Sequence, residues 1–358
     1  MDTRDTPEQA ELRRAARQLT RELGPATVAD LEDDTRAKRL SAAVRDAGWL
    51  ELRHDGGDGA PLASGVEACI VADALGSAVA DVAFAGPLLA ADLARRTGAG
   101  GAESAAVAFA ATLTEPGVGT GRVVYAVDAA SEQVDTGLVL VADGDGYRLG
   151  QVRVDGAAEG ADLTRAVRSV SAGAPVADVA GQSRLLTQDY LVEWTALGLA
   201  LTCADLVGAM RGVLDVTVSY AKERRQFGVA VGSFQSVQHL LAEAYCLMDG
   251  SLSVALHASW AVDALPPEDA LAAARVAKAY CSGAARTVCE TAIQVHGGIG
   301  NTWDCMAHVY LRRALLSSQW FGDDGEQLRQ LQQRILRVDI GPTDRYAPRE
   351  REEGGGWA

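Results

Sequence analysis

The spacing of apolar and polar residues divides the chain into a helical part, a strand-rich part and a second helical part. From residue 6 to about residue 97, apolar residues recur every three or four positions, which predicts helices separated by glycine-rich breaks. Between about residues 105 and 176, short apolar runs separated by Gly and Asp predict strands. Helical spacing then returns in four long segments, at about residues 190–224, 234–262, 268–295 and 302–336.

This order of elements predicts a mostly α-helical α+β protein with three domains. The second long segment carries one apolar stripe from Val237 to Trp260, as a helix in a bundle requires. We therefore expect an N-terminal helical domain, a small middle β domain and a C-terminal four-helix bundle. Their predicted bounds are residues 1–102, 103–186 and 187–338, and a flexible, glycine-rich tail is expected at 339–358.

The composition argues against several classes of function. Asp and Glu outnumber Lys and Arg by 48 to 33, and the resulting net charge of −15 does not favour binding to nucleic acid or to an anionic membrane. The six cysteines form no CxxC pair, so we expect core residues in a reducing cytoplasm, without disulfides or a metal site. No export signal and no run of about 18 consecutive apolar residues occurs, which predicts a protein without a membrane span.

The first candidate for chemistry is the string Y-A-K-E-R-R-Q-F-G, from Tyr220 to Gly228, at the predicted end of a long helix. One interpretation is a solvated helix end, with cations near the negative end of the helix dipole. The other is an anion-binding site, because the planar guanidinium of Arg224 suits a pyrophosphate. The residues alone leave both interpretations open.

The second candidate is the string Q-V-H-G-G-I-G-N-T-W-D, from Gln294 to Asp304, between two predicted helices. Its glycines either supply turn geometry and close helix packing, or allow the backbone to approach a phosphate beside the next helix. The carboxylate of Asp304 is either a charge near the positive end of that helix or a general base.

Together with the domain order, these two strings resemble the acyl-CoA dehydrogenase family of flavoproteins, and the resemblance covers about residues 5–338. In this family the two strings bind FAD and help to complete a site on an adjoining subunit, so the resemblance implies FAD binding and an oligomer. The residues that it assigns to FAD are Arg224, Gln226, Phe227 and Gln235, and also Gln294, Gly297 and Gly298.

The resemblance also implies that Asp304 is the catalytic base, which removes the α-proton of an acyl thioester while the flavin accepts hydride from the β-carbon. Most family members have a glutamate at this position. The aspartate side chain is shorter by one bond, about 1.5 Å, and misplacement on that scale costs about 10²-fold in rate. For this role we expect an apolar pocket that raises the pKa of Asp304.

The bundle departs from the family pattern in three further places. Asn301 stands where an aromatic residue is usual, Cys305-Met306 replaces a more polar pair, and W-F-G-D-D-G at residues 320–325 replaces the usual E-G-T. The side chains nearest to the expected site are His296, His308, Arg312 and Arg313. We expect packing or hydrogen bonding for the two histidines, and solvated ion pairs for the two arginines.

The middle domain departs further. Its string L-T-E-P-G-V-G-T, at residues 113–120, lacks the Ser-Asp that normally ends a flavin-contacting loop in this family. Thr114 and Thr120 are candidates for flavin or thioester contacts, with a surface turn as the alternative. Between residues 101 and 187 only Phe109, Tyr125 and Tyr147 are aromatic, so the domain has no Trp to pack beside a flavin.

The resemblance thus implies an FAD-dependent acyl-CoA dehydrogenase. Such an enzyme converts a saturated acyl-CoA to the trans-2-enoyl-CoA and passes electrons to an acceptor such as an electron-transfer flavoprotein. The incomplete middle-domain loop favours an alternative, a weakly catalytic or non-catalytic partner subunit of a hetero-oligomeric steroid or lipid acyl-CoA dehydrogenase. A third interpretation is a flavin oxidase that acts on another carbon acid. In each case we expect a cytoplasmic homo- or hetero-oligomer.

Overall fold

A computed structural model describes residues 4–100, 105–129, 136–156, 158 and 160–337. The first part of these residues folds into helices. Thr6 and Ser64 begin two of them with reciprocal capping bonds to Gln9 and Glu67, and Gly98 ends another with a left-handed φ of 72°. The helices are α1 (Pro7–Leu23), α2 (Asp34–Asp46), α3 (Gly65–Ser77) and α4 (Ala85–Thr97), with short 3-10 turns η1 (Val28–Glu32) and η2 (Trp49–Glu51).

The middle part forms a six-stranded sheet in the order β5-β2-β1-β3-β4-β6. All neighbouring strands are antiparallel except β1 and β3, which are parallel. The sheet has a small apolar core, separate from the main core, that includes Ala106, Ala108, Ala126 and Val139. The strands are β1 (Ala106–Ala110), β2 (Val124–Val127), β3 (Thr136–Asp143), β4 (Gly146–Arg153), β5 (Val167–Val170) and β6 (Ala177–Asp178).

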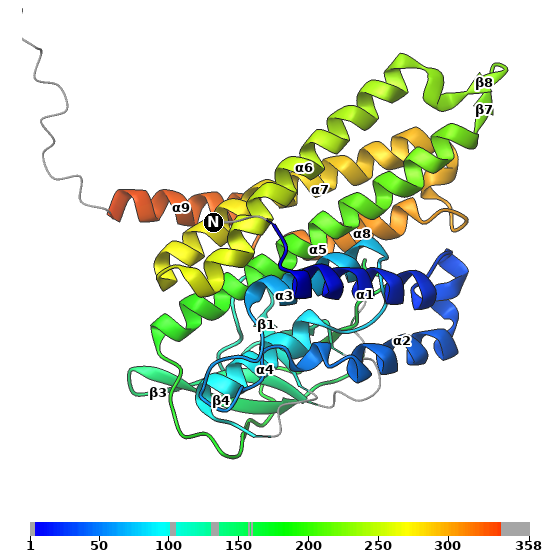
Figure 1. Ribbon diagram of the computed structural model, residues 1–358. Helices are drawn as coiled ribbons and strands as arrows, with labels where there is room; N and C mark the ends of the chain where they lie inside the picture. The colour runs from blue at the N-terminus through cyan, green and yellow to red at the C-terminus, as the bar shows by residue number, and fades with distance from the viewer. Residues whose placement is uncertain (1–3, 101–104, 130–135, 157, 159, 338–358) are drawn as a thin grey trace, which may run out of the picture.

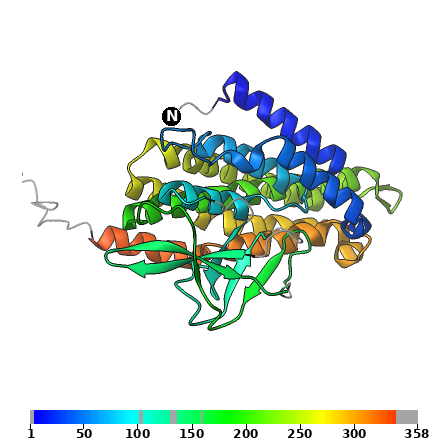
Figure 2. The same cartoon turned by 90° about the horizontal axis from the view of Figure 1, so that it is seen from below.

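The last part is a helical bundle, so the predicted order of helices, sheet and bundle is confirmed. In Figure 2 the sheet and α1 lie on opposite sides of the bundle. The long helices are α5 (Gln188–Glu223), α6 (Gln235–Ala264) and α7 (Pro267–His296), followed by α8 (Ala307–Gln319) and α9 (Asp324–Arg337). A small hairpin of β7 (Arg225–Gln226) and β8 (Val229–Ala230) and the 3-10 turn η3 (Val231–Ser233) connect α5 to α6, and the 3-10 turn η4 (Gly297–Asn301) follows α7.

The structure corrects the fourth predicted helix, which was expected to run without a break from about residue 302 to residue 336. It begins only at Ala307 and is divided into α8 and α9. The division falls at Phe321 and Gly322, whose φ angles of 65° and 89° are left-handed and cannot continue a helix. The side chains of Trp320 and Phe321 are buried there, so core packing overrides the helical spacing of the sequence.

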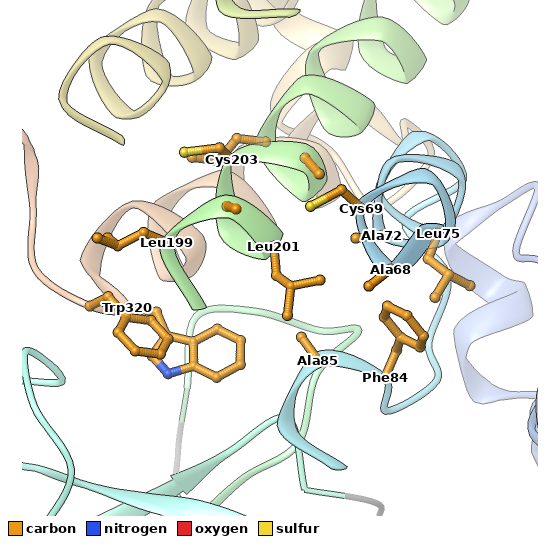
Figure 3. Close-up of a cluster of buried hydrophobic side chains, with 14 of the residues drawn as sticks. Ala68, Cys69, Ala72, Leu75, Phe84, Ala85, Leu199, Leu201, Cys203 and Trp320 are labelled. Carbon is orange, nitrogen blue, oxygen red and sulfur yellow. The ribbon is translucent and has the colours of Figure 1, made fainter. Parts of the chain in front are cut away.

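α5 is the central helix of the molecule and packs against α3, α6, α7 and α8. Figure 3 shows Leu201 of α5 pointing toward Ala85 at the start of α4, whereas Leu199 and Cys203 point to the other side of α5. Glycine makes the close crossing of α3 and α5 feasible, because a Cβ on Gly208 would lie 2.1 Å from the carbonyl oxygen of Asp73. Among the described helices, α5 alone is long and apolar enough to span a membrane, but 94% of its most apolar window is buried inside the protein.

Four aromatic rings fasten the sheet to the bundle. Phe109 of β1 lies 6.0 Å from Trp194 of α5, 5.8 Å from Trp320 and 5.0 Å from Phe321, measured between ring centroids. The backbone N–H of Phe321 donates to the carbonyl of Leu113, in the loop after β1. The string that replaces E-G-T therefore forms part of the core between two domains.

The predictions on the cysteines and on the domain boundaries are confirmed only in part or are not tested by the structure. Five of the six cysteines are buried, as expected, but Cys246 on α6 is exposed, which corrects that part of the prediction. The predicted tail at 339–358 and the domain boundary after residue 102 lie outside the described residues. The boundary after residue 186 stays a prediction; α5 begins at Gln188.

Candidate functional site

The two strings singled out in the sequence meet at one end of the bundle. The first lies at the end of α5 and in the β7–β8 hairpin, and the second lies at the end of α7 (Figure 1). The rings of Tyr220 and His296 stack with their centroids 4.4 Å apart, and the Tyr220 hydroxyl donates to the His296 carbonyl at 3.3 Å. Residues 76 positions apart in the sequence are thus joined at the base of the candidate site.

The hairpin projects from the bundle and presents polar and aromatic side chains to the outside. Its turn has left-handed φ angles at Phe227 (53°) and Gly228 (83°), and the Phe227 side chain is 94% exposed. Arg224 ends α5 through its backbone N–H, which donates to the Tyr220 carbonyl at 2.8 Å. Its guanidinium is exposed and makes no hydrogen bond or ion pair with any described residue, so its donors are available to an anion.

Three glutamines accompany these residues. Gln226 in the hairpin donates from Nε2 to the Arg225 carbonyl at 2.9 Å. Gln235 begins α6, Gln294 lies in the last turn of α7, and both side chains are exposed. The structure therefore places the predicted polar residues of both strings at the same end of the bundle.

The glycines of the second string end α7 and leave open space. Gly297 has a left-handed φ of 68°, which favours glycine over other residues. A Cβ on Gly297 or Gly298 would meet nothing within 4 Å, so another molecule could approach this backbone closely. The exposed guanidinium of Arg224 and this open backbone are compatible with a phosphate-bearing cofactor such as FAD. They do not enclose one, because every one of these predicted side chains faces outward.

Asp304 lies between η4 and α8, and its side chain is exposed. The predicted apolar pocket around it is not formed by the described residues of this chain. The neighbouring Trp303 is 64% exposed. The guanidinium of Arg312 lies 5.7 Å from the Trp303 ring and donates to the Ala161 carbonyl at 3.2 Å, which connects the Asp304 loop to the middle domain.

The two histidines differ in their surroundings. His296 is hydrogen-bonded and stacked, as expected, because its Nδ1 lies 2.8 Å from the Ala292 carbonyl. His308 is packed edge-on against Trp303 with centroids 5.1 Å apart, yet neither of its buried ring nitrogens has a hydrogen-bond partner. Burial lowers the pKa of His308, and the nearby charge of Arg312 lowers it further.

Arg313 corrects the expectation of a solvated ion pair. Its side chain is buried and donates from Nε and Nη2 to Asp205 Oδ1 of α5, at 3.0 and 2.8 Å. Arg165 of the middle domain forms a second ion pair with Asp205 at 2.6 Å, and Ser317 donates to its other oxygen at 2.8 Å. Burial opposes ionisation, but Arg165 and Arg313 hold the pKa of Asp205 below its ordinary value. The sequence signal of this network is that Asp205 stands as a single charge within the apolar stretch from Thr195 to Met210 of α5.

The hydroxyls of the middle-domain loop are used within that domain. Thr120 is buried and donates to the Ala174 carbonyl at 2.5 Å. The hydroxyls of Thr112 and Thr114 lie 2.7 Å apart. The Thr120 hydroxyl is therefore used within the domain, whereas the hydroxyl of Thr114 keeps hydrogen-bonding positions for another partner. No group of three or more His, Cys, Asp or Glu side chains among the described residues is arranged to hold a metal ion.

Comparison with known proteins agrees with this arrangement. Residues 195–336 match the family model of the acyl-CoA dehydrogenase C-terminal domain. Over 175 residues the chain is 35% identical to acyl-CoA dehydrogenase IpdE2 of Mycolicibacterium smegmatis, a match that covers 49% of this chain and 51% of the relative. The matched part thus spans about half the length of that relative.

Two solved structures extend the likeness in fold. The ChsE4-ChsE5 complex from Mycobacterium tuberculosis aligns with a TM-score of 0.75 and 24% identity, over 96% of this chain and 100% of the matched chain. The Tcur3481-Tcur3483 steroid ACAD aligns with a TM-score of 0.72 and 23% identity, over 92% and 98%. The part of the chain from residue 195 to residue 336 therefore belongs to the acyl-CoA dehydrogenase C-terminal domain family, and most of the chain shares the fold of these two structures.

Proposed function

We propose that this chain works in the FAD-dependent α,β-dehydrogenation of an acyl-CoA thioester, at a site that another subunit completes. The observation that carries this proposal is the meeting of the two strings at one end of the bundle, with the guanidinium of Arg224 free among the described residues and the backbone of Gly297 open. Because these groups face outward, they suit a cofactor that is shared between two chains.

The residues that would hold FAD are those that the sequence predicts. Arg224 would pair with a diphosphate oxygen, since a guanidinium binds such oxygens through two parallel hydrogen bonds. Gln226, Gln235 and Gln294 would donate or accept hydrogen bonds, and Phe227 would pack against an aromatic ring system. Gly297 and Gly298 would allow the ligand to approach the backbone.

In the proposed reaction Asp304 takes the proton from the α-carbon of the thioester. A bound FAD would supply the acceptor for the hydride of the β-carbon, and loss of the proton and the hydride would convert a saturated acyl-CoA to the 2-enoyl-CoA. The exposed position of Asp304 means that a second subunit and the substrate would supply the apolar surroundings that favour a carboxylate base. Trp303, held by Arg312, would form one wall of that site.

The substrate class and the partners follow from the same proposal. The Tcur3481-Tcur3483 protein is named as a steroid ACAD, and this supports a steroid or fatty acyl thioester as the substrate. An electron-transfer flavoprotein in the cytoplasm would be a suitable electron acceptor. The ChsE4-ChsE5 structure is a complex of two proteins, which supports assembly with a different chain as well as with a second copy.

A second candidate function is that of a partner subunit whose own carboxylate does not react. Two observations favour this function: Asp304 is exposed, and the hydroxyl of Thr120 already donates to the Ala174 carbonyl within the middle domain. In that case Arg224 and its neighbours would still contribute to a flavin site, but the catalytic base would belong to the other subunit.

The visible absorption spectrum of the purified protein tests flavin binding. We expect a yellow protein, either alone or after co-expression with a neighbouring dehydrogenase gene product, and the need for co-expression would favour the partner-subunit function. Arg224→Ala should release most of the flavin. Arg122→Ala, which removes an exposed arginine that makes no hydrogen bond or ion pair with a described residue, should retain it. Colourless wild-type protein under both conditions would contradict the proposal.

A further inference from the structure

A second set of arginines lies at the opposite end of the bundle from Arg224. They line a pocket of about 320 Å³ where the end of α4, the start of α5 and the end of α6 meet the segment after η2. α5 connects the two ends, and its 36 residues span about 54 Å at the usual rise of about 1.5 Å per residue. In Figure 1 this pocket end lies at the left, where α5 begins, and the β7–β8 hairpin lies at the upper right. The pocket is therefore separate from the candidate flavin site.

Three of its four arginines converge on one buried carboxylate. Asp92 on α4 is fully buried and accepts hydrogen bonds from Arg53 at 3.1 Å, from Arg95 at 2.8 Å and from Arg96 at 2.6 Å. Burial opposes ionisation, but these three guanidiniums hold the pKa of Asp92 well below its usual range. One carboxylate cannot use the donors of three guanidiniums, since each guanidinium carries five N–H groups.

Other acceptors use only part of the remaining donors. Arg96 pairs with Glu193 at 2.5 Å, and Arg53 pairs with the exposed Asp263 at 3.3 Å. Arg53 also donates to the Ala63 carbonyl and Arg95 to the Gly59 carbonyl. The Oδ1 of Asp55 accepts hydrogen bonds from the backbone N–H groups of Gly57 and Gly59, which lower the pKa of Asp55. The positive charges of Arg95 and Arg184 help to lower this pKa.

Two sets of donors remain without a partner. The Nε of Arg95 is buried and unpaired, and the Arg95 side chain is only 9% exposed. Arg184 lines the pocket from its exposed rim and makes no side-chain hydrogen bond or ion pair with a described residue. The Nε of Arg95 has almost no accessible surface, so the donors that an incoming anion can reach are first those of the exposed Arg184 guanidinium.

The chemistry of these donors selects the class of ligand. Guanidinium groups bind phosphate oxygens through paired, charge-assisted hydrogen bonds. A net charge of −15 repels an extended polyanion such as a nucleic acid, whereas a small anion needs only the local charges of the pocket. We propose that this arginine pocket binds a phosphate or pyrophosphate group, either free or carried by a nucleotide, at a site distinct from that of the flavin.

Titration calorimetry of the protein as purified, with its flavin and any partner subunit, tests this site with inorganic pyrophosphate as the probe. The variant Arg184→Ala removes an exposed side chain that makes no hydrogen bond or ion pair with a described residue, so the fold should persist. We expect its affinity for pyrophosphate to fall by about tenfold or more, because a charged hydrogen-bonding group contributes at least that factor. The matched variant Arg122→Ala makes the same change of charge elsewhere and should bind like the wild type.

A parallel titration with ADP distinguishes the two sources of the phosphate. Tighter binding of ADP than of pyrophosphate, lost in Arg184→Ala, supports a nucleotide ligand; equal or weaker binding, again lost in that variant, supports a free anion. Absence of saturable pyrophosphate binding would overturn the proposal, and so would an equal affinity in Arg184→Ala and the wild type. Neither result depends on flavin binding, because Arg224 is unchanged in all these proteins.

Discussion

Lys278 shows how the bundle accommodates a charged side chain in its interior. It is fully buried on α7, and its Nζ donates to the carbonyls of Ser317, Ser318 and Trp320 at the end of α8. The last carbonyls of a helix have no N–H group of a following turn to accept from, so the Lys278 amine donates to them instead. Burial nevertheless lowers the pKa of Lys278 from 10.5 to about 8, because the charged form loses its hydration.

This lowered pKa predicts how stability depends on pH. Between about pH 8 and about pH 10.5 the unfolded chain binds this proton more tightly than the folded one, so the free energy of unfolding should rise with pH. Compared with Lys278→Met, the wild type should gain up to about 3 kcal/mol across this range. Urea unfolding of both proteins at several pH values measures the difference. Parallel pH profiles would contradict the lowered pKa.

At the scale of single residues, the sequence predicts the composition of the candidate site better than its surroundings. Arg224, Gly297 and Asp304 could be found because each belongs to a string with recognisable spacing. The burial of Arg313 and the exposure of Asp304 could not, because both depend on which domain or subunit packs above them. Helical spacing cannot show that Arg313 faces Asp205, which is 108 residues away.

The Asp205 network predicts a large loss of stability from a small change. Asp205→Asn keeps the shape of the side chain but leaves Arg165 and Arg313 buried without their carboxylate. We expect the free energy of unfolding to fall by about 3–5 kcal/mol, as for other broken buried ion pairs. Denaturant unfolding measures this loss.

Asp145→Asn is the matched control, because Asp145 is exposed in the turn between β3 and β4. It should change stability by no more than about 0.5 kcal/mol. An equally small effect of Asp205→Asn would mean that the network does not hold α5, α8 and the middle domain together.

The β7–β8 hairpin carries an exposed aromatic side chain at the end of the bundle. Phe227 is 94% exposed, and its ring lies edge-on to that of Phe234 with 6.4 Å between the centroids. Phe227→Ser should therefore leave the stability of the isolated chain nearly unchanged. It should weaken assembly, because burial of a phenylalanine side chain contributes about 1.5–3 kcal/mol.

Sedimentation velocity measures the assembly of this variant. Leu62→Ser, which alters a 58% exposed leucine far from the hairpin, should assemble like the wild type. Normal assembly of Phe227→Ser would show that the hairpin is not part of an interface.

Elements were predicted with unequal success. α5, α6 and α7 follow the expected ranges closely, because long amphipathic or apolar helices carry a strong periodic signal. The division of the last helix was missed, because its cause is the burial of Trp320 and Phe321 against Phe109 in another domain. A tertiary contact of this kind leaves no local signal in the sequence.

At the scale of the whole molecule, apolar side chains are exposed at the end that carries the candidate site. Phe227, Ile299 and Trp303 are 94%, 42% and 64% exposed. Exposed apolar side chains that gather near one end of a protein are typical of a surface that binds another protein. The exposed residues proposed to bind the cofactor and these apolar groups have the same explanation if a second subunit covers both.

The central claim is that Asp304 removes a proton from a thioester while a flavin accepts hydride, and anaerobic absorption spectroscopy tests it most directly. An acyl-CoA is added to the flavin-loaded assembly, first with the wild-type chain and then with Asp304→Asn. The account predicts that the visible absorbance of the flavin falls when acyl-CoA is added to the wild type. The variant should retain its flavin and keep this absorbance. Bleaching of Asp304→Asn at the wild-type rate would contradict it and would assign the base to the partner subunit.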